Sequence, residues 1–279
     1  MTKKFSPCGE IVRAGDPDRF RTALFAEPEK REHLFALYAF NLEIAKIAPM
    51  VSEPMLGEIR LQWWREAIEA AYTDGTVRSH EVVEPLTRAI REKHLLKRCF
   101  DLIIDARAQD LDPAFPENPE SLKKYLGDTG GSLAILACIA SGAIGDKSIE
   151  VVQDVGTAIA IARYLEAAPI LIEQGKRTFA HEPETSDSEQ DHEGKSETVR
   201  TQTDPHLAEA VRSLAEYGLE RLVLARKHRG MVPKENTPAL LEARLAEPIL
   251  RHHNKQPMDW EKPAPSKLRV LWGGLCGRW

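Results

Sequence analysis

Apolar residues recur at steps of three and four positions along most of the chain. Between Glu29 and Ala48 this spacing gives the stripe Leu34, Leu37, Tyr38, Leu42 and Ala45. Such a period places apolar side chains on one face of an α-helix. Other apolar residues fill the remaining faces, so we expect a helix that is buried on most sides and that ends near Pro49.

The same spacing predicts eight further helices, and the alternation typical of strands is scarce. The expected helices cover Pro54–Tyr72, Glu81–Lys97, Arg98–Leu111, Ser121–Gly142, Asp146–Ile172, Pro205–Arg229, Thr237–His253 and Ser266–Cys276. We expect Pro169 to interrupt the Asp146–Ile172 helix. Helices without strands predict an all-α fold, and 279 residues fit one domain over 1–279.

One segment, at about 181–205, breaks the helical pattern. It carries eight Asp and Glu against one Lys and one Arg, and Val199 is its single large apolar residue. Such a stretch cannot bury enough apolar surface to offset the entropy of ordering it. We expect a flexible, solvated acidic loop there.

Composition and charge exclude several classes of protein. A net charge of −5 argues against a main role in binding nucleic acid. We find no apolar run that reaches 18 residues and no apolar leader at the N-terminus, so we expect no transmembrane segment and no secretion. The four cysteines lie far apart, which is typical of reduced thiols. These observations favour a cytoplasmic protein.

Four stretches resemble, in order, the squalene/phytoene synthase family. The first runs from Arg19 to Tyr72 and holds ALYAF at its centre and Trp64-Arg65 near its end. The others are DARAQDL at 105–111, YLGDTGGSL at 125–133, and GTAIAIARYLEAAPILIEQGKR at 156–177. The resemblance implies an isoprenoid-synthase-like helical bundle with a central cavity. In that family two facing helices each offer aspartates one turn apart, which hold Mg²⁺ ions against a prenyl diphosphate.

The residues at those aspartate positions depart from the family pattern. Alignment on ALYAF puts Ala45, Lys46 and Pro49 at the first motif. Alignment on Gly156 puts Ala167, Ile170 and Leu171 at the second. No aspartate occurs between Arg19 and Thr73 or between Val155 and Ser186, so a shifted alignment does not restore them. We therefore expect no catalytic residues, no metal and no cofactor.

Five residues are candidates for lining the inherited cavity: Tyr38, Glu43, Tyr125, Arg163 and Glu166. Glu43 binds a cation or polar ligand, or it pairs with Lys46 or Arg163. Glu166 either has a similar role or forms a pair with Arg163 on the helix surface. Tyr125 matches a tyrosine that the family's synthases use in their first half-reaction, and the alternative is a packed tyrosine whose hydroxyl is hydrogen-bonded.

A non-catalytic branch of the family, a mitochondrial complex I assembly factor, is similar to this chain around VSEPMLGEIRLQWW and RYLEAAP. That likeness favours a binding or assembly factor, with a respiratory-chain subunit or an isoprenoid-like lipid as partner. Two alternatives stay open. One is an active prenyl-diphosphate transferase whose reduced Mg²⁺ site uses Glu43 and Glu166. The other is an isoprenoid or lipid carrier.

The end of the chain, LRVLWGGLCGRW at 268–279, combines large apolar residues with Arg269 and Arg278. It either packs as the last helix of the bundle or docks on a membrane surface or partner. Peripheral contact with the inner membrane is therefore part of the expectation.

Overall fold

The computed structural model describes residues 5–73, 75–179, 204–261 and 267–279. Within these ranges every regular element is a helix, which confirms the all-α expectation. The elements of the N-terminal half are α1 (Pro7–Gly15), α2 (Pro17–Ala23), α3 (Pro28–Ala45), α4 (Ile47–Met50), α5 (Pro54–Tyr72), α6 (Val83–Lys93), α7 (Lys97–Ala108) and η1 (Gln109–Leu111).

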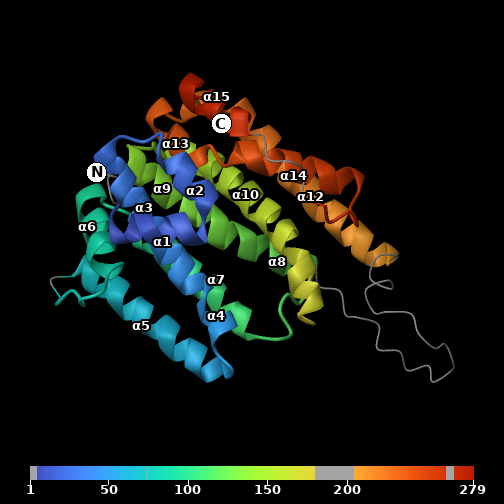
Figure 1. Cartoon of the computed structure of the whole chain (residues 1–279), viewed down its shortest axis with the longest axis horizontal. Helices are drawn as coiled ribbons and strands as arrows, with labels where there is room; N and C mark the ends of the chain where they lie inside the picture. Colours follow the sequence, from blue (N-terminus) through green and yellow to red (C-terminus); the bar gives the residue numbers. More distant parts are fainter. Residues whose placement is uncertain (1–4, 74, 180–203, 262–266) are drawn as a thin grey trace.

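The C-terminal half continues the helical pattern, and in Figure 1 its last part, coloured orange to red, lies along one side of the bundle. Its elements are α8 (Pro119–Leu126), η2 (Gly127–Gly131), α9 (Ser132–Ser141), α10 (Asp146–Glu173), α12 (Pro205–Lys227), η3 (Arg229–Met231), η4 (Lys234–Asn236), α13 (Thr237–Leu240), α14 (Ala243–Lys255) and α15 (Lys267–Cys276).

Prolines mark many of the helix starts. A proline occupies the first turn of α1, α2, α3, α5, α8, α12 and α13. Proline suits that place because the N–H it lacks would have no partner inside the helix. Side chains cap several of the same helices: Ser6 accepts from the N–H of Gly9, and Asp16 accepts from the N–H of Arg19. These local signals fix where the helices begin.

The core forms around α10, which packs against α9, α12, α14 and η2. The closest approach joins two glycines. A Cβ atom on Gly156 of α10 would lie 2.4 Å from the carbonyl oxygen of Gly130 in η2. Only the absence of a side chain lets the two backbones touch there. The turn at η2 is π-helical, and it keeps α8 and α9 in one continuous helical run, as the prediction for Ser121–Gly142 has it.

Several sequence predictions differ from the structure. The single helix expected over Thr237–His253 is divided into α13 and α14, with a turn at Leu241 and Glu242 between them. The interruption at Pro169 is wrong, because α10 runs through Pro169 to Glu173; that site lies in the last turns, where one lost hydrogen bond leaves the helix intact. The predicted end at Pro49 is displaced, since α3 ends at Ala45 and α4 contains Pro49. Helices α1 and α2 were not predicted, and Asp16, which lies between them, and Arg19 of α2 belong to the site described below.

Length and composition alone would let one helix of the described chain, α10, cross a membrane. In this fold its most apolar window is 56% buried, and it packs against α9, α12 and α14. The core helix of a folded domain meets the same length and composition criteria. Residues 180–203, which include most of the acidic segment, lie outside the described ranges, and Asp204 caps the start of α12.

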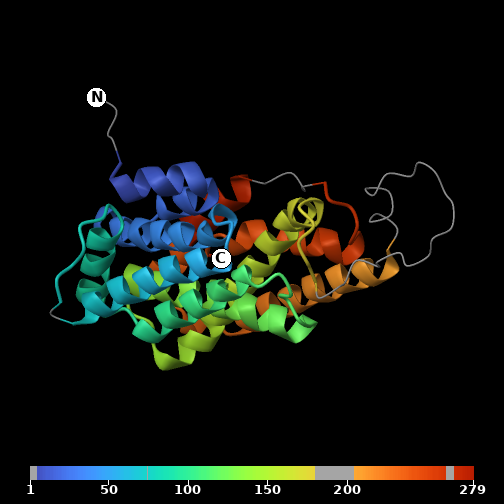
Figure 2. The ribbon, with the colours of Figure 1, turned by 90° about the horizontal axis from the view of Figure 1, so that it is seen from below.

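Figure 2 shows the bundle from below, with α1 and α2 lying across one side of it. Their inner faces reach the core through Cys8, Val12 and Phe20, and Phe20 stacks on Phe35 of α3 at 5.3 Å. Helices α1 and α2 both pack against α3. Residues 5–23 are therefore part of the central packing.

Candidate functional site

The first aspartate-motif position lies at the end of α3. Ala45 is the half-buried last residue of that helix, and Pro49 is exposed in α4. The Nζ atom of Lys46 donates to Oε1 of Glu43 at 3.0 Å, so the nearest carboxylate is already in an ion pair. Of the partners left open for Glu43, the structure shows Lys46.

The second motif position lies near the end of α10. Ala167, Leu171 and Glu166 are half-buried there. Arg163, one turn earlier, directs its guanidinium to two carboxylates from distant parts of the chain, those of Asp16 and Glu242. Among the described residues these two, and not Glu43 or Glu166, form ion pairs with Arg163.

Asp16, Arg19, Arg163 and Glu242 form a closed ring of alternating charges, which we call the buried ion ring. Nη2 of Arg163 lies 2.8 Å from Oδ1 of Asp16, and Nη1 of Arg19 lies 3.3 Å from Oδ2. Nε of Arg19 lies 3.2 Å from Oε2 of Glu242, whose Oε1 accepts from Nε of Arg163. All four carboxylate oxygens are thus engaged by guanidinium groups.

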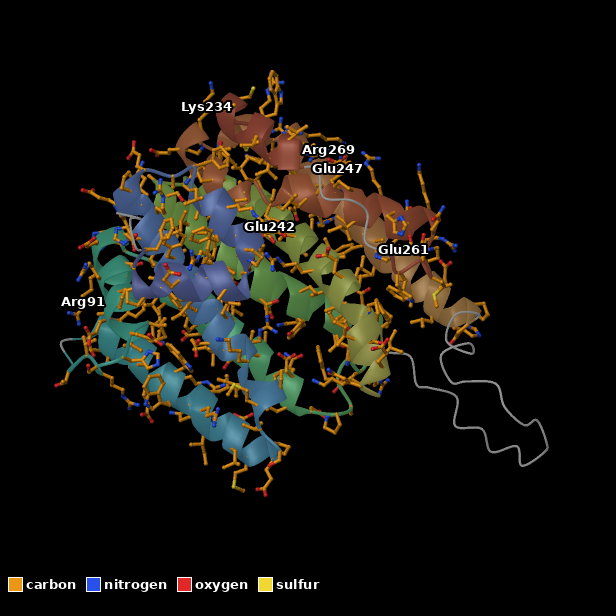
Figure 3. The ribbon with its side chains drawn as sticks, in the orientation of Figure 1. Arg91, Lys234, Glu242, Glu247, Glu261 and Arg269 are labelled. Atoms are coloured by element: carbon orange, nitrogen blue, oxygen red, sulfur yellow. The ribbon has the colours of Figure 1, made fainter. Side chains whose placement is uncertain are left out.

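Three members of the ring are buried and the fourth reaches the surface. Asp16, Arg19 and Glu242 are 3%, 9% and 6% exposed, whereas the side chain of Arg163 is 34% exposed. Figure 3 labels Glu242 near the middle of the molecule. Burial by itself would raise the pKa of Asp16, but Arg19 and Arg163 outweigh it and hold that pKa below its ordinary value. The two guanidinium groups thus favour the ionised form of Asp16.

Tyr38 borders the ring on the side of α3. Its phenol ring lies beneath the guanidinium of Arg19, 5.4 Å from centroid to Cζ. Tyr38 is 3% exposed, and burial raises the pKa of its hydroxyl far above the ordinary value. A neutral tyrosine against a paired arginine is a packing and cation–π contact.

Tyr125 belongs to a second buried polar cluster. Nη1 of Arg107 donates to the Tyr125 hydroxyl at 2.6 Å and to Oδ2 of Asp110 at 3.1 Å. Asp110 lies close to that hydroxyl and raises its pKa, and Phe115 packs on the ring at 5.1 Å. Burial raises the pKa of Tyr125 well above its ordinary value, although Arg107 lowers it. The hydroxyl thus accepts a hydrogen bond from Arg107 inside the fold.

Tyr164 of α10 faces the same cluster and contacts the segment that follows the helix. Phe179 packs edge-on against the Tyr164 ring at 5.4 Å and adopts a left-handed backbone conformation, with φ 53°. Burial raises the pKa of the Tyr164 hydroxyl, and the backbone of Phe179 beside it partly lowers that pKa. Residues 176–179 therefore fold back over the end of α10, where Phe179 is 4% exposed.

These residues do not fit a Mg²⁺–diphosphate site. Mg²⁺ takes oxygen ligands, whereas the four motif positions carry Ala45, Pro49, Ala167 and Leu171. Within the described ranges no group of three or more His, Cys, Asp or Glu could hold a metal ion. A hollow of about 340 Å³ lies elsewhere, at the surface beside α6, and is lined by Val77, Glu84, Thr87, Arg88, Arg91 and Glu92. The central cavity stays a prediction.

Sequence reasoning named Tyr38 and Arg163 but missed Asp16, Arg19 and Glu242. A weak signal was present, because an Asp followed by Pro is a common helix start and Asp16 is such a cap. Nothing local connects Asp16 to Arg163 or to Glu242, since these residues lie on elements far apart in the chain.

Comparison with known proteins agrees with this architecture. The sequence model of the squalene/phytoene synthase family matches residues 12–273. Among solved structures, a dehydrosqualene synthase in complex with ligand superposes with a TM-score of 0.75 at 14% identity, covering 97% of this chain and 93% of that one. The squalene synthase HpnC from Alicyclobacillus acidocaldarius gives 0.71 at 15%, covering 89% and 92%.

Curated relatives carry a different description. "NADH dehydrogenase (ubiquinone) complex I, assembly factor 6" is 28% identical over 265 residues both from Bos taurus and from Homo sapiens, covering 95% of this chain and 78% of each relative. The Dictyostelium discoideum homolog is 24% identical over 251 residues and covers 88% and 68%. The solved structures share the isoprenoid-synthase fold, and the family match spans nearly the whole sequence. The chain therefore belongs to the squalene/phytoene synthase family.

Proposed function

We propose that this protein is a non-catalytic assembly factor for respiratory complex I. The observation that carries the proposal is the extent of the likeness to complex I assembly factor 6, which covers 95% of this chain at 28% identity. Likeness spread over a whole fold supports a shared role better than a short shared motif would. The partner is then a subunit of the respiratory chain.

The local chemistry supports the same proposal. Stabilising a departing diphosphate requires metal ions or other positive charge placed at the leaving oxygens. Here Lys46 neutralises Glu43 at the first motif position. Arg163 beside the second position is neutralised by Asp16 and Glu242. Neither pair leaves a free charge for binding a metal–diphosphate group, so the inherited fold serves to bind a partner.

Deletion of the gene in the organism that encodes the protein tests the proposal. We expect loss of NADH:quinone oxidoreductase activity and of the intact complex on a native gel, with succinate:quinone oxidoreductase unchanged as the control. Expression of the Glu43→Gln variant from a plasmid is expected to restore both, because the proposal gives Glu43 no chemical task. Normal complex I in the deletion strain would contradict the proposal.

Prenyl transfer with a reduced metal site, using Glu43 and Glu166, is the competing function, and the shared fold favours it. We expect no Mg²⁺-dependent release of diphosphate when the purified protein meets farnesyl or geranylgeranyl diphosphate. Release that disappears in Glu43→Gln and Glu166→Gln variants would establish the enzyme instead. A co-purifying isoprenoid found by mass spectrometry, without turnover, would point to a lipid carrier.

The proposal places the protein in the cytoplasm, close to the membrane in which the respiratory complexes are built. Fractionation of cells tests that placement. We expect the protein in the soluble fraction after a high-salt wash and partly on membranes without it. Retention on membranes through the wash and alkaline carbonate would contradict a peripheral placement.

A further inference from the structure

Helix α15 turns its most apolar side outward. Leu268, Leu271, Trp272 and Leu275 are 76%, 49%, 69% and 79% exposed. Their spacing of three, one and three positions puts them on one stripe of the helix, which we call the α15 apolar face. A helix packed on a soluble domain normally directs such a stripe to the core. The exposure of this stripe therefore indicates a surface that binds a partner or a membrane.

The inner side of α15 is fixed to the bundle. Val270 is 7% and Trp279 is 2% exposed. A Cβ atom on Gly273 would lie 2.6 Å from the carbonyl oxygen of Arg278 and 3.2 Å from Leu241. One on Gly274 would lie 2.4 Å from the ring of Phe25. These close contacts leave the helix no room to rotate its apolar face inward.

Arginines surround this helix. Nε of Arg244 donates to the carbonyl oxygen of Arg278 at 3.3 Å, and the guanidinium of Arg229 lies 5.0 Å from the ring centroid of Trp279. Together with Arg226 and Arg269 they make up the arginine cluster. Figure 3 shows Lys234 and Arg269 on the edge of the molecule that α15 occupies.

The arginine cluster carries a surplus of positive charge. Burial lowers the pKa of Arg229, and repulsion from Arg226, Arg244 and Arg278 lowers it further. Nearby Glu247 is shared between Arg226 at 2.8 Å and Arg251 at 2.7 Å. The sequence shows the same asymmetry, because from Arg226 onward the chain has eleven Lys and Arg against five Asp and Glu, although its net charge is −5.

We propose that the α15 apolar face and the arginine cluster together bind the surface of an anionic phospholipid membrane. Leucines and a tryptophan on a short helix that lies flat on the domain suit the boundary between headgroups and acyl chains, where tryptophan is enriched. Arginines beside such a helix suit anionic headgroups, with each cation near the surface adding about a fivefold gain in binding. An acidic protein partner would satisfy the arginines but leave the four apolar side chains without a reason to be exposed.

Cys276 provides a reporter for this contact. It is the exposed cysteine on α15, while Cys8, Cys99 and Cys138 are buried. A maleimide carrying an environment-sensitive fluorophore should therefore label Cys276 selectively in the folded protein. We expect a blue shift and brighter emission with vesicles of phosphatidylcholine containing about one third phosphatidylglycerol, and a much smaller change with phosphatidylcholine alone.

Variants at exposed positions test both components without disturbing the core. Leu268→Glu with Leu275→Glu, and separately Arg269→Glu with Arg278→Glu, are each expected to lower co-sedimentation with the anionic vesicles by about tenfold or more. The matched control is Met55→Glu with Ile59→Glu on α5, which is also exposed but lies at the other end of the bundle. That control should bind as the unaltered protein does, with circular dichroism showing all variants folded.

Three results would overturn the proposal. They are an absence of binding to anionic vesicles, equal loss in the α5 control, and binding that neither pair of α15 substitutions weakens. A dimer that forms without lipid and is abolished by Leu268→Glu with Leu275→Glu would assign the face to a second copy of the chain. Vesicle binding uses the purified protein alone, so its outcome is independent of any effect on complex I.

Discussion

Arg163 joins two carboxylates that lie 147 and 79 positions away in the chain. The sequence identified Arg163 through the family resemblance, and helical spacing was enough to suggest the Glu43–Lys46 pair, because residues three positions apart share a helix face. The same rule suggested Glu166 for Arg163, whereas the structure gives Arg163 Asp16 and Glu242. Such partners depend on how distant helices pack, which local spacing does not encode.

Removal of the Arg163 guanidinium is expected to destabilise the protein by about 2 kcal/mol, because Asp16 and Glu242 would each lose a partner while remaining buried. This loss is smaller than for a fully buried pair, since the Arg163 side chain is 34% exposed and Arg19 still contacts both carboxylates. The variant is Arg163→Met, measured by urea unfolding followed by circular dichroism. The matched control is Lys46→Met, which removes the cation of the half-exposed pair with Glu43 and should cost less than about 1 kcal/mol. Equal losses of unfolding free energy in the two variants would show that the buried ion ring stabilises the protein no more than the pair of Lys46 with Glu43 does.

Stability should fall as the pH falls from about 4.5 to about 2. Burial alone would raise the pKa of Glu247, but Arg226 and Arg251 lower it from 4.5 to about 2. In this window the unfolded chain binds protons that the folded protein does not, so acid favours unfolding. The low pKa of Asp16 acts in the same direction. Thermal unfolding against pH should show a shallower acid dependence in Glu247→Gln than in the unaltered protein, and an identical dependence would contradict this assignment.

At the scale of elements, the fold was largely predictable where a helix shows one apolar stripe and begins with proline or a capping side chain. Helices α5, α8, α12 and α13 begin with such a proline. Helices α6, α7, α10 and α14 begin with neither signal, so their apolar spacing alone predicted them. The break between α6 and α7 was placed only approximately, because it depends on His94 adopting a left-handed conformation with φ 52°. Helices α1 and α2 escaped prediction since each is only two or three turns long, too short for periodicity to be clear.

The crossing of η2 over α10 depends on two facing glycines, so a single methyl group should disrupt it. Gly156→Ala would place a Cβ atom 2.4 Å from the carbonyl oxygen of Gly130, and we expect a loss of about 2 kcal/mol or more in the free energy of unfolding. Gly145→Ala, at the start of the same helix, meets nothing within 4 Å. That control should stay within about 0.5 kcal/mol of the unaltered protein. A neutral Gly156→Ala would mean that the helices can separate at little cost.

At the scale of the whole molecule, one hydrophobic cluster extends from Cys8 to Trp279 through all parts of the described chain. Its existence was predictable from the number of apolar stripes. The buried charged residues were not predictable. In a single sequence a charged residue is expected at the surface, and it becomes buried only when several helices pack over it. The site is therefore less predictable than the fold that contains it.

The reactivity of the cysteines measures how well the helical core is closed to solvent. Burial raises the pKa of Cys8, with help from Glu32 and Glu81, to about 12, and burial also raises the pKa values of Cys99 and Cys138. A thiol reagent should therefore modify one cysteine, Cys276, quickly in the folded protein and four after denaturation. Cys276→Ser should abolish the fast phase. Rapid modification of a second thiol in that variant would show that the core opens locally.

The buried ion ring also constrains the order in which the protein can be made. Asp16 and Arg19 leave the ribosome early and Arg163 midway, but Glu242 follows only when most of the chain has been synthesised. Until then two arginines share one carboxylate, and the interior carries an excess positive charge that favours solvent over burial. We therefore expect helices α2 and α10 to pack stably against each other only once the α13–α14 segment is present. A polypeptide that ends before Glu242 would leave one arginine charge of the ring uncompensated, and we expect it to be more sensitive to proteolysis than the full chain.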